Sequence, residues 1–126
     1  MRTLSTIFTL IVILLGGSFA SYQYIQSSTQ ALGSQLMTVE QSISTQRWDV
    51  AQKELNITQQ DWDKSKTWWT ILHDHQEIDM IDLSLKRLNM YIATQNLPLS
   101  LGEVAALELL FNHIADTEQL NLRNIL

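Results

Sequence analysis

One apolar stretch near the N-terminus decides the fold of this chain: residues 3–25 read TLSTIFTLIVILLGGSFASYQYI. The stretch carries no charge, and Arg2 stands directly before it. Its predominantly apolar part runs from Leu4 to Ala20, and the two tyrosines that follow can extend it. At about 1.5 Å per helical residue this length is roughly 26 to 33 Å, enough to cross a bilayer core. We predict a membrane anchor over residues 1–25, with membrane contact through residues 4–25.

The basic residues predict how the anchor is oriented. Arg2 and the amino terminus precede the apolar stretch, and the next basic residue is Arg47. Because positively charged flanks stay in the cytoplasm, we expect a single-pass protein of the cell membrane. Its N-terminus is predicted to be cytoplasmic and residues 26–126 extracytoplasmic.

Cleavage of the anchor is an open alternative. The small residues of Ser18-Phe19-Ala20 suit a signal peptidase site, and Gly16-Gly17 would break a helix just before it. Tyr22 and Tyr24 instead resemble the aromatic belt of a retained anchor. We favour retention, and a protein secreted after cleavage at Ala20 is the alternative.

Composition excludes several classes of function. The chain has 126 residues and a formal charge of −5, which argues against a nucleic-acid partner. It contains no cysteine, so disulfides, thiolate catalysis and cysteine-ligated metals are excluded. An extracytoplasmic domain held together by packing alone favours a bacterial envelope protein.

Beyond residue 25 the spacing of apolar residues is helical, and no alternating run typical of a strand occurs. We predict a stalk helix or linker over residues 26–45 and a helical bundle domain over residues 46–126. The fold class is therefore all-α: an N-terminal transmembrane helix followed by a small antiparallel up-and-down bundle of three to four helices. A TPR-like helical hairpin is an alternative form of the bundle, because Trp48-x2-Ala51 and a helix pair of roughly thirty residues are typical of that repeat. No second copy of this pattern is visible in the sequence, which argues against a repeat array.

The bundle is expected to hold three helices after the stalk. The first covers about 46–72, with an interruption around 63–66 left open, and the second covers 75–95 with Asp74 as its N-cap. The third follows a turn at 95–98, has Ser100 as its N-cap and ends near Glu118. The predicted buried stripes are Leu32, Leu36, Val39 and Ile43; Trp48, Ala51, Leu55, Thr58, Trp62, Ser65, Trp69 and Leu72; Ile78, Ile81, Leu85, Leu88 and Ile92; and Leu101, Val104, Leu107, Phe111 and Ile114.

A group of histidines and carboxylates is the candidate metal site. His75, Asp79 and Asp82 are spaced to share one face of a helix, and His113 could add a fourth ligand. The alternative is a capping aspartate, a histidine paired with a carboxylate and a solvated acidic face. No nucleophile is placed by a recognisable motif, so we expect no catalytic residues, no cofactor and no enzymatic activity.

Four tryptophans are many for so small a domain. Trp69 continues the buried stripe, whereas Trp68 lies about 100° away around the helix. Because both cannot face the same core, we expect one of the pair, Trp68 or Trp69, to bind a partner or to contact lipid headgroups.

The run from Trp68-Trp69 through Asp74-His75-x-Glu77-Ile78-Asp79 to Tyr91-Ile92 resembles a family of small bacterial proteins, a domain of unknown function (family 4363). Leu110-x-x-His113-Ile114 and the closing Asn124-Ile125-Leu126 also resemble it, and the likeness is expected to span nearly the whole chain, the anchor included. The resemblance implies a single-span membrane protein, often encoded beside a multi-span membrane protein that would be a partner. It implies no activity and no cofactor, but it directs attention to Asp74, His75, Glu77 and His113.

The leading hypothesis is a membrane-anchored accessory or interaction protein for another envelope protein. The alternative is a metal- or ligand-binding sensor domain that uses the His/Asp/Glu face. The apolar heptad stripe also leaves a homo-oligomer open.

Overall fold

The structure, a computed structural model, describes residues 1–72 and 74–125, and it leaves out the side chains of Ile25, Leu72 and residues 117–125. The chain forms α1 (Arg2–Ser44), α2 (Trp48–Leu72), α3 (His75–Ala93) and α4 (Leu97–Ile125). The described residues contain no strand. The predicted all-α class is confirmed.

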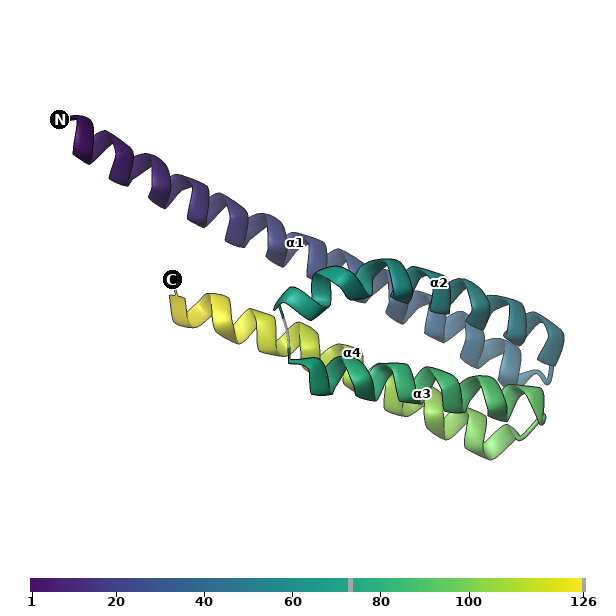
Figure 1. The fold of residues 1–126 in the computed structure, drawn as a ribbon. Helices are drawn as coiled ribbons and strands as arrows, with labels where there is room; N and C mark the ends of the chain where they lie inside the picture. The colour runs from purple at the N-terminus through teal and green to yellow at the C-terminus, as the bar shows by residue number, and fades with distance from the viewer. Residues whose placement is uncertain (73, 126) are drawn as a thin grey trace.

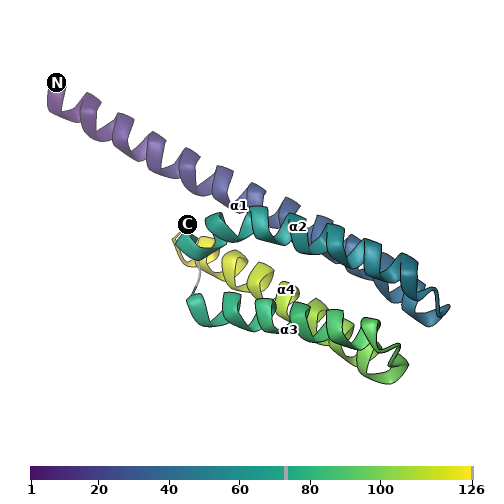
Figure 2. The ribbon, with the colours of Figure 1, turned by 45° about the vertical axis from the view of Figure 1, so that its right-hand side comes forward.

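The helices form an antiparallel four-helix bundle from which α1 projects (Figures 1 and 2). The second half of α1 packs against α2 and α4, and α3 packs against the same two helices. The C-terminal ends of α2 and α4 and the start of α3 lie at the end of the bundle where α1 emerges. We call this end the base.

The predicted stalk is the fourth helix of the bundle. α1 continues without a break from the apolar stretch into the bundle, where Leu32, Leu36, Val39 and Ile43 are buried. The flexible-linker alternative for residues 26–45 is therefore wrong. The break expected at Gly16 and Gly17 is also absent, because a glycine costs a helix only about 1 kcal/mol and the flanking residues are good helix formers.

The predicted buried stripes are confirmed wherever the side chains are described, with Trp48 and Leu101 packed at the margin of the core. An aromatic cluster of Trp62, Trp69 and Phe111 lies at its centre. The ring centroids of Trp62 and Trp69 are 5.3 Å apart, and those of Trp62 and Phe111 are 5.9 Å apart. The edge-to-face contact between Trp62 and Trp69 adds about 0.5–1.5 kcal/mol beyond burial.

α2 runs through residues 63–66 without the interruption left open above. Its polar stretch still contributes to packing, because the buried Ser65 hydroxyl lies 3.3 Å from the hydroxyl of Ser28 on α1. Trp62 and Trp69 anchor the turns on either side of it. Tertiary contacts therefore override the weak helix preference of these residues.

One helix cap is as predicted and another is not. The Asp74 carboxylate accepts a hydrogen bond from the Gln76 backbone N–H at 3.3 Å, as expected of an N-cap. The cap of α4 is Asn96, which accepts from the Leu99 N–H at 3.1 Å, and the predicted cap Ser100 is buried one turn into the helix. Pro98 is tolerated there because the N–H groups of a first turn have no intrahelical partner. α4 also continues past Glu118.

The turns after α1 and α3 are the same Schellman motif. Gln46 N–H donates to Ile43 at 2.9 Å and Arg47 N–H donates to Ser42 at 2.9 Å. After α3 the equivalent bonds run from Gln95 to Ile92 at 3.0 Å and from Asn96 to Tyr91 at 2.9 Å. Both glutamines have left-handed backbones, with φ of 57° at Gln46 and 54° at Gln95, at the position that glycine usually fills.

The two hairpins, α1–α2 and α3–α4, repeat one pattern with an offset of 49 residues. Buried residues at matching positions are Thr29/Ile78, Leu32/Ile81, Leu36/Leu85, Val39/Leu88, Ile43/Ile92, Ala51/Ser100, Leu55/Val104, Thr58/Leu107, Trp62/Phe111 and Ser65/Ile114. Glu54 and Glu103 also match, and each accepts a hydrogen bond from a serine of the preceding helix. Most matched residues differ in type, so the sequence alone shows no second copy although the structure does.

Candidate functional site

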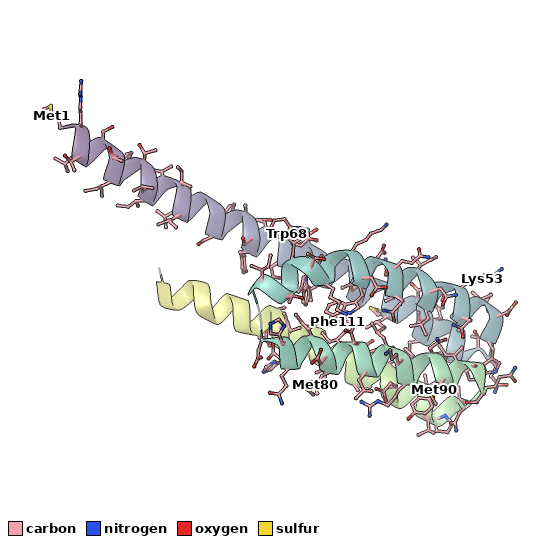
Figure 3. All side chains as sticks on the ribbon, in the orientation of Figure 1. Met1, Lys53, Trp68, Met80, Met90 and Phe111 are labelled. Carbon is pink, nitrogen blue, oxygen red and sulfur yellow. The ribbon has the colours of Figure 1, made fainter. Side chains whose placement is uncertain are left out.

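The structure separates the two tryptophans proposed as partner-binding residues. Trp69 is buried in the aromatic cluster, with its ring centroid 6.4 Å from that of Phe111. It cannot reach a partner while the bundle is folded, so the prediction is corrected at this residue. Trp68 is exposed at the base, beside Tyr24 of α1 at a centroid distance of 6.2 Å (Figure 3).

Asp82 belongs to a network between α2 and α3. Its Oδ1 accepts from the indole Nε1 of the buried Trp62 at 2.7 Å, and its Oδ2 lies 2.6 Å from the Lys66 ammonium. The hydrogen bond to Asp82 raises the pKa of Lys66 above its usual value, against the opposing effect of burial. The carboxylate is therefore used in joining two helices.

The proposed metal ligands do not gather at one point. His75 and Asp79 are exposed, Asp82 faces α2, and His113 Nδ1 lies 3.2 Å from Glu77 Oε1. Within the described parts of the chain, no three histidine, aspartate or glutamate side chains converge as a metal site would require. Metal binding by these four residues stays a prediction, and the contact that the structure adds is the pairing of His113 with Glu77.

A groove of about 370 Å³ runs between α1 and α4 and carries two glutamates. Its lining includes Gly33, Met37 and Phe111 as well as Glu40 and Glu108. Burial raises the pKa of Glu108 above its usual value, and the neighbouring Glu40 adds to the rise. The two glutamates, one from each helix, therefore lie close together in this groove.

The outer surface of α3 and α4 exposes large apolar side chains that sequence reasoning missed. Met80, Leu83 and Met90 recur at three and seven residues on the face of α3 opposite its core stripe, and Met80 and Met90 can be followed in Figure 3. Leu99 and Leu109 are exposed on the neighbouring α4. We call these five residues the α3–α4 face. The signal was present as a second apolar stripe in residues 80–90.

Polar contacts hold the two helices of the α3–α4 face together. Glu103 of α4 contacts two residues of α3. It accepts a hydrogen bond from Ser84 at 2.5 Å and lies 3.4 Å from the Arg87 guanidinium. These contacts fix how the two helices lie relative to each other. A partner would therefore meet a surface that is ordered in advance, which lowers the entropic cost of binding.

Comparison with known proteins gives one match. The family described as a domain of unknown function (DUF4363) matches residues 19–125, so residues 1–18 of the apolar stretch lie outside the matched region. No curated protein and no solved structure matches the chain. The match extends over all of the bundle, and the chain therefore belongs to the DUF4363 family of domains of unknown function.

Proposed function

We propose that this protein is a single-pass, membrane-anchored accessory protein whose extracytoplasmic helical bundle binds another envelope protein. The proposed anchor is supported by the N-terminal half of α1, which the bundle does not cover. It is the helix in the described part of the chain that is long and apolar enough to cross a membrane, and none of its apolar window is buried by the bundle.

The exposed area of this half-helix argues for a lipid environment. Ten large apolar side chains between Leu4 and Phe19 are exposed. Burial of such a side chain is worth about 1.5–3 kcal/mol, so placing them in lipid gains on the order of 15–30 kcal/mol. The described part of the bundle does not cover these side chains, and the proposed environment is the hydrocarbon core of a bilayer.

The α3–α4 face is the proposed partner surface. It exposes five large apolar side chains on two helices that are fixed by the Ser84–Glu103–Arg87 contacts. Apolar side chains that gather on an exposed surface are typical of protein interaction sites. The partner class that we favour is a multi-span membrane protein, since the proposed anchor would hold the bundle beside the membrane and the family resemblance implies such a partner.

The anchor and its orientation can be tested with the full chain, because it contains no cysteine and each variant then carries a single thiol. Lys53 is exposed at the far end of the bundle (Figure 3). We expect a membrane-impermeant maleimide to label Lys53→Cys in intact cells. A cysteine in an N-terminal tag should react only after permeabilisation.

Each result has a defined meaning. Release of the protein by alkaline extraction would contradict the anchor, and labelling of Lys53→Cys only in permeabilised cells would reverse the orientation. A mature protein that lacks the first twenty residues would favour the secreted alternative. Retention of the uncleaved chain in extracted membranes supports the proposal.

The partner surface can be tested with a photo-crosslinking residue at Leu83, with Ile57 of α2 as the matched control. The two side chains are 52% and 53% exposed, so they differ in position rather than in accessibility. We expect a discrete adduct from Leu83 in native membranes, and its loss when Leu109→Glu is added. Equal adducts from both positions, or none from either, would count against this surface, and an adduct of twice the chain's own mass would identify a homo-oligomer.

A further inference from the structure

The base of the bundle carries an exposed surface that lies outside the proposed α3–α4 partner surface. Trp68 is 57% exposed, Ile71 is 72% exposed and Tyr24 is 42% exposed, although each is large and apolar or amphipathic. The rings of Tyr24 and Trp68 lie together at 6.2 Å. α2 therefore ends beside the point at which α1 leaves the bundle.

This surface is continuous with the apolar stretch of α1. Ala20 and Ser21 of that stretch join Tyr24 and Trp68 in lining a hollow of about 260 Å³. The hollow is smaller than the roughly 300–1,000 Å³ of a typical small-molecule site. Because its walls include the end of the membrane-spanning segment, the material next to it is the lipid that surrounds that segment.

The order of side chains along α2 matches the order of polarity across a membrane interface. Lys64, Trp68 and Ile71 are all exposed and are spaced at four and three residues, so they share one face of the helix. In the direction of the proposed membrane, these residues present a cation, then an indole and then an aliphatic side chain. Phosphate, glycerol and acyl chain follow in the same direction, and lysine and tryptophan are the residues that favour the first two layers.

The other side of the base has the opposite character. The first turns of α3 present Asp74, Glu77 and Asp79, of which Asp74 and Asp79 are exposed. Anionic side chains near anionic lipid headgroups are unfavourable. The two sides of the base are therefore unequal, and only the α1–α2 side suits contact with lipid.

We infer that the α1–α2 side of the base, through Lys64, Trp68, Ile71 and Tyr24, is a second membrane contact that rests in the phospholipid interface. The α3 side stays in water, so the bundle leans toward its α1–α2 side. This inference rests on the proposed membrane anchor, and it adds a contact that an anchor alone does not require.

The test uses the full chain in vesicles of phosphatidylcholine and phosphatidylglycerol, with spin labels on single cysteines. Ile71→Cys reports the proposed contact and leaves Trp68 in place. Ile57→Cys lies on the same face of α2, about 21 Å farther from the base at 1.5 Å per residue. Gln76→Cys is exposed at the base on the α3 side.

We expect the label at residue 71 to be more accessible to dissolved oxygen than to a water-soluble nickel chelate. The labels at residues 57 and 76 should show the reverse order. The inference is overturned if residue 71 behaves like residue 57 while the protein floats with the vesicles, and in that case the anchor survives. Failure to float overturns the anchor and the lipid contact together.

A second measurement avoids any change at Ile71. Lipids brominated near the glycerol should quench part of the intrinsic tryptophan fluorescence, and Trp68→Phe should remove that part. Trp48→Phe, at the opposite end of α2, is the control and should leave the quenching in place. Equal quenching in wild type and Trp68→Phe would overturn the inference.

Discussion

Asp82 is a candidate metal ligand by sequence and joins α3 to α2 in the structure. The sequence placed it among candidate metal ligands, whereas the structure engages both of its oxygens with α2. Trp62 is fully buried. Without an acceptor, its indole N–H would lose its hydration and gain no hydrogen bond in return. The contact therefore stabilises the position of α3 on α2.

We expect Asp82→Ala to lower the free energy of unfolding by about 1–3 kcal/mol, because it leaves the buried indole donor unpaired. Asp82→Asn keeps an acceptor for Trp62 and removes the charge that faces Lys66. The Lys66 side chain is 41% exposed, so the asparagine variant should lose less than about 1 kcal/mol. Urea unfolding of the full chain in detergent measures both, and equal losses would show that the ion pair dominates.

Glu108 gives the fold a defined dependence on pH. Its pKa is raised in the folded state by burial and then by Glu40, so the folded chain binds the proton more tightly than the unfolded chain. Stability should therefore fall as pH rises from the unfolded pKa through the folded pKa, and the loss should persist above it.

Glu108→Gln is expected to remove this dependence and to raise the melting temperature at pH 7. At a pH below the usual pKa of glutamate the variant and the wild type should differ least. Thermal unfolding followed by circular dichroism between pH 4 and pH 8 checks the sign. A wild type whose stability rose across this range relative to the variant would contradict the assignment.

At the scale of the element, the two Schellman turns place a non-glycine residue where glycine is favoured. A left-handed backbone costs an L-residue about 1–2 kcal/mol, and glycine avoids this cost. Part of the gain is offset because glycine has more conformational freedom to lose when the chain folds. Gln46→Gly and Gln95→Gly should each stabilise the bundle by about 0.5–1 kcal/mol, with additive effects because the turns lie in separate hairpins.

Ala93→Gly is the matched control for these turn variants. Ala93 is the last residue of α3, two positions before Gln95, and it has a helical backbone. Glycine should destabilise the chain there by about 0.5–1 kcal/mol. Denaturant titration measures the sign of each change, and stabilisation by all three glycines would rule out a specific effect of the left-handed turn.

Periodicity predicted the helices and their buried faces because a helix has 3.6 residues per turn, so burial of one face makes apolar residues recur at that spacing. It separated Trp68 from Trp69 correctly, since neighbours on a helix point about 100° apart. The start of α4 was missed because Asn96 and Ser100 are both acceptable caps, and the choice depends on the turn that precedes them. The pairing of His113 with Glu77 was missed because it depends on how α3 and α4 align.

For the whole molecule, insertion of α1 and folding of the bundle should be separable. Ile11→Arg together with Leu14→Arg places two charges in the exposed apolar half of α1. Each charge near the centre of a span disfavours insertion by about 2.5–3.5 kcal/mol, so we expect the protein to leave the alkaline-extracted membrane fraction. Ser27→Arg, at an exposed position beyond the apolar stretch, is the control and should stay in that fraction.

The continuity of α1 has a mechanical consequence. No loop separates the half that is proposed to cross the bilayer from the half that packs against α2 and α4. A span that tilts to match a thinner bilayer must then carry the bundle with it as a lever. The angle between the α3–α4 face and the bilayer would then follow bilayer thickness, so lipid composition would set the direction in which that face points.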